Sequence, residues 1–398
     1  MSLFAEVAQA PRDPILGLNE QFNADSNPAK VNLGVGVYTD ENGKLPLLAC
    51  VRTAERQLTE APKPRGYLPI DGIVAYDRAV QRLVFGADSE ILRTGRVATV
   101  QALGGTGGLK VGADFLKQLN PDSTVLISDP SWENHRALFS QAGFEVENYP
   151  YYDAKNHGID FAAMLAAFSR APAGCIIVLH ACCHNPTGYD LSPAQWDQVV
   201  EVIKNGRLVP FLDLAYQGFG DGITADGAVV QQFVGAGLDF LVSTSFSKSF
   251  SLYGERVGAL SVACASDEQA RRVLSQLKIL IRTNYSNPPT HGAQVVAMVL
   301  DSPELRHVWE EELAAMRERI KRMRALLPER LAAAGARRDF SFIARQRGMF
   351  SYSGLDATQM ERLRTEFGIY GVSTGRICVA ALNLGNIDYV AAGIVKVL

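Results

Sequence analysis

Long apolar runs are absent from this sequence: no stretch of about 18 apolar residues occurs, and no basic region followed by an apolar one opens it. An excess of one charge is absent too, because 39 basic and 42 acidic residues leave a net charge of -3. Such a balance gives no overall field for nucleic acid or an anionic membrane. We therefore expect a protein that spans no membrane, stays in the cytoplasm and binds small molecules.

Cysteine is scarce, and its six residues follow no CxxC or other metal-binding spacing (Cys50, Cys175, Cys182, Cys183, Cys264 and Cys378). A chain of 398 residues with 47% hydrophobic content has material for a large core and does not need disulfides. We expect reduced thiols, and the length predicts two domains. Repeats and flexible linkers are also lacking, so the two domains should share a substantial interface.

Strands and helices alternate from about residue 96. Residues 96–103 are typical of a strand, the glycine-rich residues 104–108 of a turn, and residues 109–119 of an amphipathic helix. Five further apolar runs are short and β-rich, as strands buried on both faces are (124–128, 175–179, 208–212, 240–244 and 258–263). The pattern predicts an α/β fold in which helices sandwich a mostly parallel sheet. Such sheets bind ligands outside the carboxyl ends of their strands.

The C-terminal part has a different character. Residues 290–334 are helical in period and rich in Glu and Arg, as expected of a helix that links two domains. Beyond them, alternation predicts strands and helical periods predict helices (strands at 340–343 and 349–352, helices at 357–367 and 387–398). We predict a large domain over residues 46–315 and a smaller α+β domain over residues 316–398, which the N-terminal residues 1–45 join as an arm and as part of that domain.

Lys248 follows an apolar run and ends the motif Ser245-Phe-Ser-Lys. An ammonium is strongly hydrated, so its position after a buried strand costs stability unless the amine is converted to an imine or paired. The hydroxyls of Ser245 and Ser247 and the guanidinium of Arg256 are suited to a phosphate nearby. We interpret Lys248 as a Schiff-base lysine for pyridoxal 5'-phosphate (PLP). The spacing also matches the SxxK of serine acyl-enzymes, but their Lys-Thr-Gly and Ser-Asp-Asn motifs are absent.

The glycine run at 104–108 can present backbone N–H groups and a helix N-terminus to a phosphate, although a purely structural turn fits the pattern equally. It matches neither the dinucleotide motif nor the P-loop, because Lys110 is at the wrong spacing. Asp213 ends the apolar run 208–212, and a buried carboxylate there can pair with the protonated pyridine nitrogen of PLP or cap the next helix. Tyr216 can hydrogen-bond the phenolic oxygen of PLP or serve only in packing.

Another predicted strand ends in Asn-Pro and Gly, and the amide of Asn185 in this turn can donate to a cofactor oxygen. A zinc site in the turn is disfavoured, because adjacent strand residues point to opposite faces (His180, Cys182, Cys183 and His184), and we expect no metal. Trp132 has a flat face suited to stacking on a heteroaromatic ring, but both it and His135 also fit the core. Arg376 and Arg282 are candidates for binding a carboxylate, although most arginines are solvated ion-pair partners.

Nine motifs spread over essentially the whole chain resemble the class I, fold-type I PLP-dependent aminotransferases (Asn-Leu-Gly-Val-Gly-Val-Tyr at 32–38, Tyr-Leu-Pro-Ile-Asp-Gly from 67, Gly-Gly-Thr-Gly at 104–107, Ser-Trp-Glu-Asn-His at 131–135, His-Asn-Pro-Thr-Gly at 184–188, Asp-Leu-Ala-Tyr-Gln-Gly-Phe at 213–219, Ser-Phe-Ser-Lys at 245–248, Arg-Thr-Asn-Tyr-Ser-Asn-Pro-Pro at 282–289 and Gly-Arg at 375–376). Within this family the chain is similar to bacterial aromatic-amino-acid (tyrosine) aminotransferases, with aspartate aminotransferases as near neighbours. Gly108 stands where alanine is more frequent, a change that we expect to be tolerated.

The resemblance implies a role for each candidate residue. Lys248 would carry PLP covalently and move the proton in catalysis, and Asp213 would pair with the pyridine nitrogen, with His135 and His180 beside it. The other cofactor contacts would come from Tyr216 and Asn185 at the phenolic oxygen, Trp132 at the ring, and, at the phosphate, Gly105, Thr106, Ser245, Arg256 and a second subunit's Tyr67. The substrate would be bound by Gly36, Trp132, Asn185, Arg376 and, at a side-chain carboxylate, a second subunit's Arg282.

The resemblance also implies a homodimer with shared active sites. The enzyme would transfer the amino group of tyrosine or phenylalanine, and of aspartate as well, to 2-oxoglutarate by a ping-pong mechanism. Closure of the small domain would exclude water. An aspartate aminotransferase with aspartate and oxaloacetate as its main pair is the alternative. A PLP-fold sensor would have an appended DNA-binding segment or lack the lysine, and the sequence shows neither.

Overall fold

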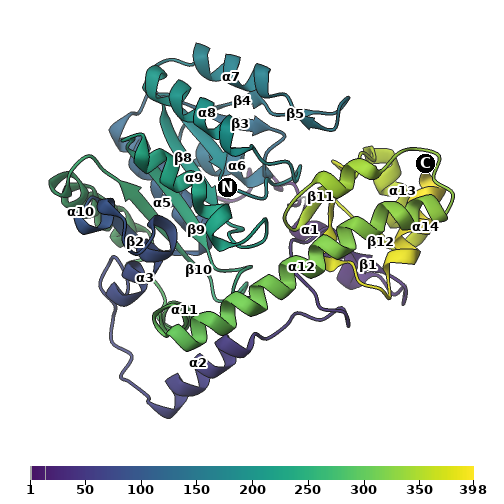
Figure 1. The fold of residues 1–398 in the computed structure, drawn as a ribbon, viewed down its shortest axis with the longest axis horizontal. Helices are drawn as coiled ribbons and strands as arrows, with labels where there is room; N and C mark the ends of the chain where they lie inside the picture. Colours follow the sequence, from purple (N-terminus) through teal and green to yellow (C-terminus); the bar gives the residue numbers. More distant parts are fainter. Residues whose placement is uncertain (1, 14) are drawn as a thin grey trace.

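The computed structural model describes residues 2–13 and 15–398, and its core is a sheet of seven strands (Figure 1). The strands are β2 (Val97–Leu103), β3 (Thr124–Asp129), β4 (Glu145–Pro150), β7 (Ile176–His180), β8 (Val209–Leu214), β9 (Phe240–Ser245) and β10 (Val257–Ala263). Their order in the sheet is β2-β10-β9-β8-β7-β3-β4. Only β10 runs antiparallel to its neighbours, so the predicted α/β fold with a mostly parallel sheet is confirmed.

Helices cover both faces of this sheet (Figure 1). They are α3 (Val74–Phe85), α5 (Gly104–Leu119), α6 (Glu133–Gln141), α7 (Phe161–Arg170), α8 (Pro193–Gly206), α9 (Ile223–Gly235), α10 (Asp267–Asn284) and α11 (His291–Asp301). Along β3, Val125 and Ile127 belong to the hydrophobic cluster that contains side chains of α5 and α6, whereas Leu126 belongs to the cluster of α8 and α9. Successive side chains of a strand point to opposite faces, so the apolar runs of the sequence are strands buried on both sides.

A smaller group of elements surrounds the C-terminal half of α12 (Pro303–Ala333), a helix of 31 residues (Figure 1). It contains η1 (Ser341–Arg345), β11 (Phe350–Tyr352), α13 (Ala357–Phe367), β12 (Ile369–Tyr370), β13 (Arg376–Cys378), η2 (Val379–Ala381) and α14 (Ile387–Val397). The N-terminal strand β1 (Val31–Asn32) pairs with β12, so residues near both ends of the chain lie together here. The remaining elements are α1 (Leu16–Ala24), α2 (Ala49–Glu60), α4 (Glu90–Arg93), β5 (Tyr152–Asp153) and β6 (Gly158–Ile159).

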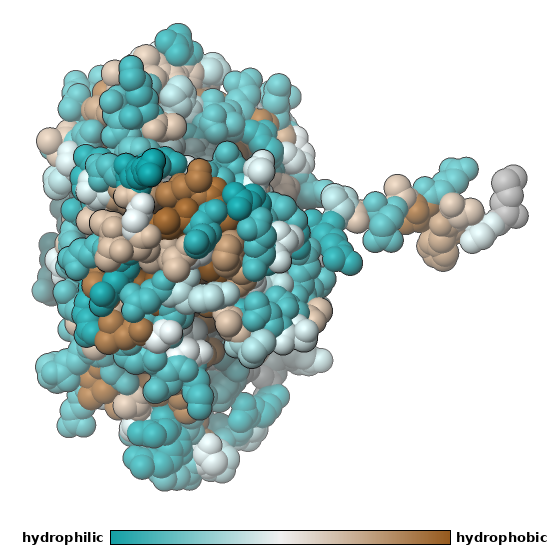
Figure 2. All heavy atoms as spheres, turned by 90° about the vertical axis from the view of Figure 1, so that its right-hand side faces the viewer, coloured by the Kyte–Doolittle hydropathy of each residue, from teal (hydrophilic) through white to brown (hydrophobic). Residues whose placement is uncertain are grey.

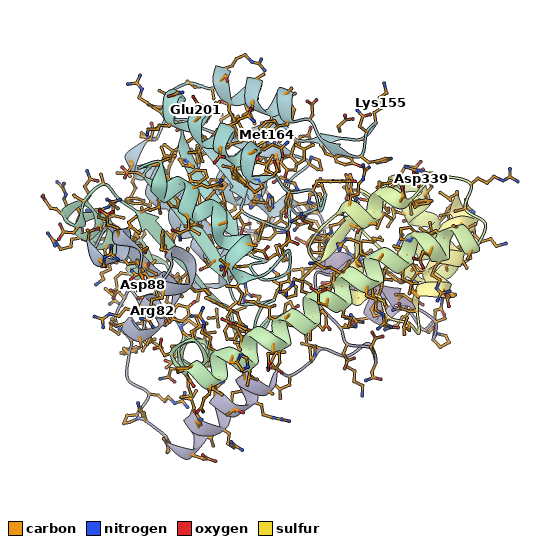
Figure 3. The ribbon with its side chains drawn as sticks, in the orientation of Figure 1. Arg82, Asp88, Lys155, Met164, Glu201 and Asp339 are labelled. Atoms are coloured by element: carbon orange, nitrogen blue, oxygen red, sulfur yellow. The ribbon has the colours of Figure 1, made fainter. Side chains whose placement is uncertain are left out.

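The hairpin of β5 and β6 packs against this smaller group of elements. The ring of His157 stacks on that of Phe342, with 3.8 Å between their centroids. Figure 3 labels Lys155 in the turn of the hairpin and Asp339 just before η1.

Three local predictions are wrong. Residues 104–108 form the first turn of α5 and not a turn before it. Residues 340–343 form no strand, because most of them belong to the 3-10 helix η1; their alternation arises from two buried rings, Phe340 and Phe342. The helical period over 290–334 corresponds to two helices, since Pro303 has no N–H to continue α11 and instead begins α12.

Strand β4 was missing from the prediction because its sequence is polar. It is the edge strand next to β3, and Glu145 and Glu147 are exposed there. Figure 2 shows an extended arm that projects from the body of the protein, and the apolar side chains of Leu3, Phe4 and Val7 near the start of the chain are exposed. Within the described ranges, none of the helices combines the length and the apolar character needed to cross a bilayer.

Candidate active site

A cavity of about 350 Å³ lies where β7, β8 and β9 end and faces the smaller group of elements. Ligands of parallel sheets bind at such strand ends. The cavity collects the predicted site residues except Tyr67 and Arg282 (Gly36, Gly105, Thr106, Trp132, Asn185, Asp213, Tyr216, Ser245, Lys248, Arg256 and Arg376). Segments that are far apart in the sequence therefore meet at one place, as the motifs predict.

The two exceptions lie on the surface of the chain. The side chain of Tyr67 is 97% exposed. Arg282, in the last turn of α10, is also exposed and donates a hydrogen bond to Oγ of Ser286. Such positions suit residues that serve the site of a second subunit, an assignment that stays a prediction.

Lys248 lies just beyond the end of β9, and its amine faces the cavity. Nζ lies 4.8 Å from the centroid of the Tyr216 ring. Burial lowers the pKa of Lys248 to about 8; the carboxylate of Asp213 opposes this effect, and the guanidinium groups of Arg256 and Arg376 add to it. The amine therefore loses its proton more easily than an ordinary lysine, as covalent and acid–base chemistry require.

Asp213 is buried in β8 beside the cavity. Its Oδ2 lies 2.9 Å from Nε2 of His135, and Nδ1 of His135 lies 2.9 Å from Oγ of Ser131. Burial acts to raise the pKa of Asp213, but the hydrogen bond and charge of His135, together with His180 and Lys248, bring that pKa below its usual value. The site thus keeps a buried carboxylate ionised and ready to pair with a cation.

His180, at the end of β7, is close to Asp213 but makes no hydrogen bond to it. The centroids of the His180 and His135 rings are 4.9 Å apart. Neither ring nitrogen of His180 has a hydrogen-bond partner among the described residues. Burial and the neighbouring His184 and His135 lower the pKa of His180, so the ring is neutral at pH 7 and offers one donor and one acceptor.

An anion cradle is formed by the start of α5 and the segments that follow β9. The backbone N–H of Gly104 donates to the carbonyl of Arg256 over 3.0 Å, and a Cβ at Gly104 would lie 2.5 Å from Nη2 of Arg256. Nη1 of Arg256 donates to Oγ of Ser247 over 3.4 Å. Gly105 and Ser245 are packed so closely that a Cβ at Gly105 would lie 3.1 Å from Cβ of Ser245. A helix N-terminus, hydroxyls and a guanidinium therefore converge, as in phosphate sites.

Arg376 is fully buried at the start of β13, across the cavity from the sheet. Its guanidinium donates to Oδ1 of Asn185 over 3.1 Å and to the carbonyl of Gly34 over 2.6 Å, and it lies 4.3 Å from the centroid of the Phe350 ring. It forms no ion pair with any residue in 2–13 or 15–398, and Nε has no partner there. A buried cation without a counter-ion is a suitable partner for a carboxylate ligand.

The apolar wall of the cavity was largely missed by the sequence analysis. Its side chains come from segments on both sides of the cavity (Ile15, Val35, Val37, Leu109, Tyr253 and Phe350). The sequence carries one signal for Phe350, the alternating stretch 349–352, of which residues 350–352 form β11. Nothing in the pattern marked Ile15 or Leu109, because apolar residues that line a cavity look like core residues in a sequence.

The four residues considered as zinc ligands do not form one cluster (His180, Cys182, Cys183 and His184). His180 clusters with His135 and Asp213, whereas Cys182 and Cys183 cluster with Asp226. The carboxylate of Asp226 already accepts three backbone hydrogen bonds. Neither cluster therefore resembles a prepared tetrahedral site.

Together these features define an α/β enzyme whose site is built around a lysine, a carboxylate and an anion cradle. The sequence profile described as "Aminotransferase class I and II" matches residues 28–394. The chain belongs to this family and is an aminotransferase, which confirms the resemblance.

Similar proteins support the same conclusion. An aspartate aminotransferase of Pseudomonas aeruginosa is 65% identical over the whole of both chains. An aromatic-amino-acid aminotransferase of Escherichia coli is 50% identical, again over the whole of both chains. The solved structure of an aromatic-amino-acid aminotransferase from Burkholderia pseudomallei, covalently bound to pyridoxal phosphate, is 68% identical over the whole of both chains and superposes with a TM-score of 0.97.

Proposed function

We propose that the protein is an aromatic-amino-acid aminotransferase. It transfers the amino group of tyrosine or phenylalanine, and of aspartate as well, to 2-oxoglutarate by a ping-pong mechanism with PLP. The observation that carries the proposal is the placement of the Lys248 amine in one cavity with the ionised Asp213 and the unpaired Arg376. A covalent amine, a partner for a pyridinium and a carboxylate clamp are what transamination needs.

The residues of the cavity fit PLP. Arg256, Ser245, Gly105 and Thr106 would hold the phosphate, with Tyr67 of a second copy of the chain. The neutral hydroxyl of Tyr216 and the amide of Asn185 would contact the phenolic oxygen, and Trp132 would stack on the ring. When bound, PLP supplies an electron sink that acidifies the α-carbon of the amino acid.

The chain itself supplies binding and proton transfer. Arg376, with Asn185 and the backbone of Gly36, holds the α-carboxylate of the amino acid and so orients its Cα–H bond. Nζ of Lys248 takes this proton as a general base and later returns it, a role for which a pKa of about 8 is suitable and which contributes roughly 10²- to 10⁴-fold. Asp213 is ionised and would pair with the protonated pyridine nitrogen of PLP. Closure of the smaller domain excludes water.

The apolar wall supports an aromatic substrate. Val37, Leu109 and Ile15 line the cavity and would contact the ring of tyrosine or phenylalanine. A dicarboxylic substrate needs a second cation, and Arg282 of a second copy of the chain would provide it. Aspartate aminotransferase activity with oxaloacetate is the second candidate, favoured by the relative from Pseudomonas aeruginosa that carries that name.

We further propose a homodimer with shared sites in the cytoplasm. The exposed side chains of Tyr67, Arg282 and Phe4 support the dimer, because each would gain a partner from a second copy. All six cysteines are free, which fits a reducing compartment.

We also propose that residues 46–315 form the large domain and that residues 1–45 and 316–398 form the smaller one.

Spectroscopy of the purified protein tests the proposal. With PLP bound, the visible absorption band should fall when L-tyrosine is added and return with 2-oxoglutarate. Lys248→Ala should retain PLP noncovalently but show no turnover, and borohydride reduction followed by peptide mapping should place the phosphopyridoxyl group on Lys248. A protein that stays colourless with PLP, or an adduct on another lysine, would contradict the proposal.

A further inference from the structure

A strained turn follows β7 and leads the chain into the cavity. Cys183 has φ of 52°, in the left-handed region that costs energy for a residue with a Cβ. Such conformations persist only where surrounding contacts hold them, and they are frequent at functional sites. The turn therefore needs a group that fixes it.

Asp190 is that group. Its Oδ2 accepts the backbone N–H of Cys183 over 2.7 Å, and its Oδ1 accepts the backbone N–H of His184 over 2.8 Å. Burial raises the pKa of Asp190 to about 6, against the effect of these two hydrogen bonds. One carboxylate thus fixes two successive peptide groups of the turn, even though its own burial is unfavourable.

The turn carries one side of the substrate site. The next residue is Asn185, whose Oδ1 accepts a hydrogen bond from Arg376 over 3.1 Å. A rotation of the peptide groups held by Asp190 would move this amide and remove one of the contacts that orient the guanidinium of Arg376.

The segment that carries Phe350, on the opposite side of the cavity, also contacts the turn at Cys183. A Cβ at Gly348 would lie 2.4 Å from Cβ of Cys183, so the segment before β11 packs directly on the turn. The buried guanidinium of Arg324 fixes this segment through the carbonyls of Gly348 and Phe350, each over 2.7 Å. The ring of Phe350 in turn covers the guanidinium of Arg376, so two of the groups around that arginine, Asn185 and Phe350, lie next to or pack on the turn at Cys183.

We propose that Asp190 is a positioning residue that holds the left-handed turn at Cys183 and thereby sets Asn185 and Phe350 around Arg376 for binding of the substrate carboxylate. It touches neither substrate nor cofactor. The inference rests on the proposed function, because the carboxylate that Arg376 binds is that of the amino acid.

The test compares Asp190→Asn with the double variant Asp190→Asn, Cys183→Gly, using the full-length protein loaded with PLP. Glycine adopts the left-handed conformation without strain, so it removes the need for the clamp. Asp160→Asn is the matched control, because Asp160 also accepts a backbone N–H, but at the start of α7, a helix that contributes no residue to the cavity. The measurements are KM and kcat for L-tyrosine, the dissociation constant of PLP, and the thermal midpoint of the apoprotein.

Asp190→Asn should raise KM for L-tyrosine about tenfold, more than it lowers kcat, and should weaken PLP because Asn185 moves; about tenfold is the loss expected for one charged hydrogen bond. The added Cys183→Gly should bring KM back to within about threefold of the wild type, even where the thermal midpoint stays low. Asp160→Asn should change neither constant. If Asp190→Asn does not fold, Asp190→Glu, which keeps the charge but shifts both oxygens, should show the same rise in KM and the same rescue.

A lower thermal midpoint with unchanged KM and PLP affinity would overturn the proposal, as would a failure of Cys183→Gly to restore KM. These results presuppose that the wild type transaminates. A wild type that is inactive with every amino acid would contradict the proposed function instead.

Discussion

Nε2 of His135 lies 2.9 Å from Oδ2 of Asp213, although 78 positions separate the two residues in the sequence. The same imidazole lies 2.9 Å from Oγ of Ser131, so it connects the carboxylate in β8 to the start of α6. This contact is the main reason that a buried carboxylate keeps a lowered pKa. Asp213 can therefore act as a permanent negative charge beneath the cavity.

Asp213→Ala should reduce the rate of transamination by roughly 10²- to 10³-fold, the loss typical of one preorganised electrostatic partner. His135→Leu should cause a smaller loss, because the pKa of Asp213 then rises but the carboxylate remains. Steady-state kcat with L-tyrosine, normalised to the PLP content of each preparation, measures both effects. Equal activity of Asp213→Ala and the wild type would contradict the role of Asp213.

Lys248 should make the stability of the apoprotein depend on pH between about 8 and 10.5. Its pKa falls from 10.5 to about 8 on folding, so the unfolded chain binds more protons in this window and the stability of the wild type rises with pH. Below pH 8 the buried charge destabilises the fold, and Lys248→Met should be more stable by on the order of 3 kcal/mol at pH 7.

Urea unfolding of both apoproteins at pH 7 and at pH 10.5 measures this difference, which should nearly vanish at the higher pH. The exposed Lys155 offers a control, because Lys155→Met should leave the pH dependence unchanged. A difference that stays constant over the window would show that the amine of Lys248 is not desolvated.

Arg282→Ala should weaken the binding of dicarboxylic substrates and leave the binding of aromatic substrates nearly unchanged. Loss of the guanidinium should raise KM for aspartate by about 10- to 100-fold, the cost of one charged contact, and should change KM for tyrosine little. Arg272→Ala is a control on the same helix, since Arg272 is exposed and, within residues 2–13 and 15–398, forms an ion pair with Glu268 alone. An equal rise of KM for both substrates would contradict the assignment of Arg282 to the side-chain carboxylate.

Gly108→Ala should destabilise the protein, although alanine is more frequent at this position in the family that the chain resembles. A Cβ at Gly108 would lie 2.6 Å from Oγ of Ser243 and 2.9 Å from the carbonyl oxygen of Ala259, so α5 would have to move away from the sheet. We expect a loss of about 1–3 kcal/mol in the free energy of unfolding, as for other overpacked cores.

Gly235→Ala is the matched control, because a Cβ there, at the end of α9, would meet no atom within 4 Å. It should stabilise the protein by about 0.5–1 kcal/mol through the smaller entropy of the unfolded chain. Urea denaturation gives both values. A neutral Gly108→Ala would mean that α5 and the sheet adjust more easily than their packing suggests.

The predictions from sequence agree best with the structure where the local residue pattern determines the secondary structure. The apolar runs became strands because they are short and bounded by turn residues, and the residues with distinctive chemistry, such as Lys248 and Asp213, follow or end these strands. The predictions failed where a pattern has two physical causes. Glycines at 104–108 indicate a turn, but here they let the start of α5 approach Arg256.

The sequence by itself determined six of the seven strands of the sheet and marked Lys248, Asp213 and Arg376 as candidates for the site, because residue type and local period carry that information. Only the tertiary structure decided which groups meet. It places His135, and not His180, in hydrogen-bond contact with Asp213, and it places the ring of Phe350 over the guanidinium of Arg376. The physical reason is that these contacts join segments whose separation in space depends on the packing of the whole fold. A residue's own neighbours in the chain do not specify that packing.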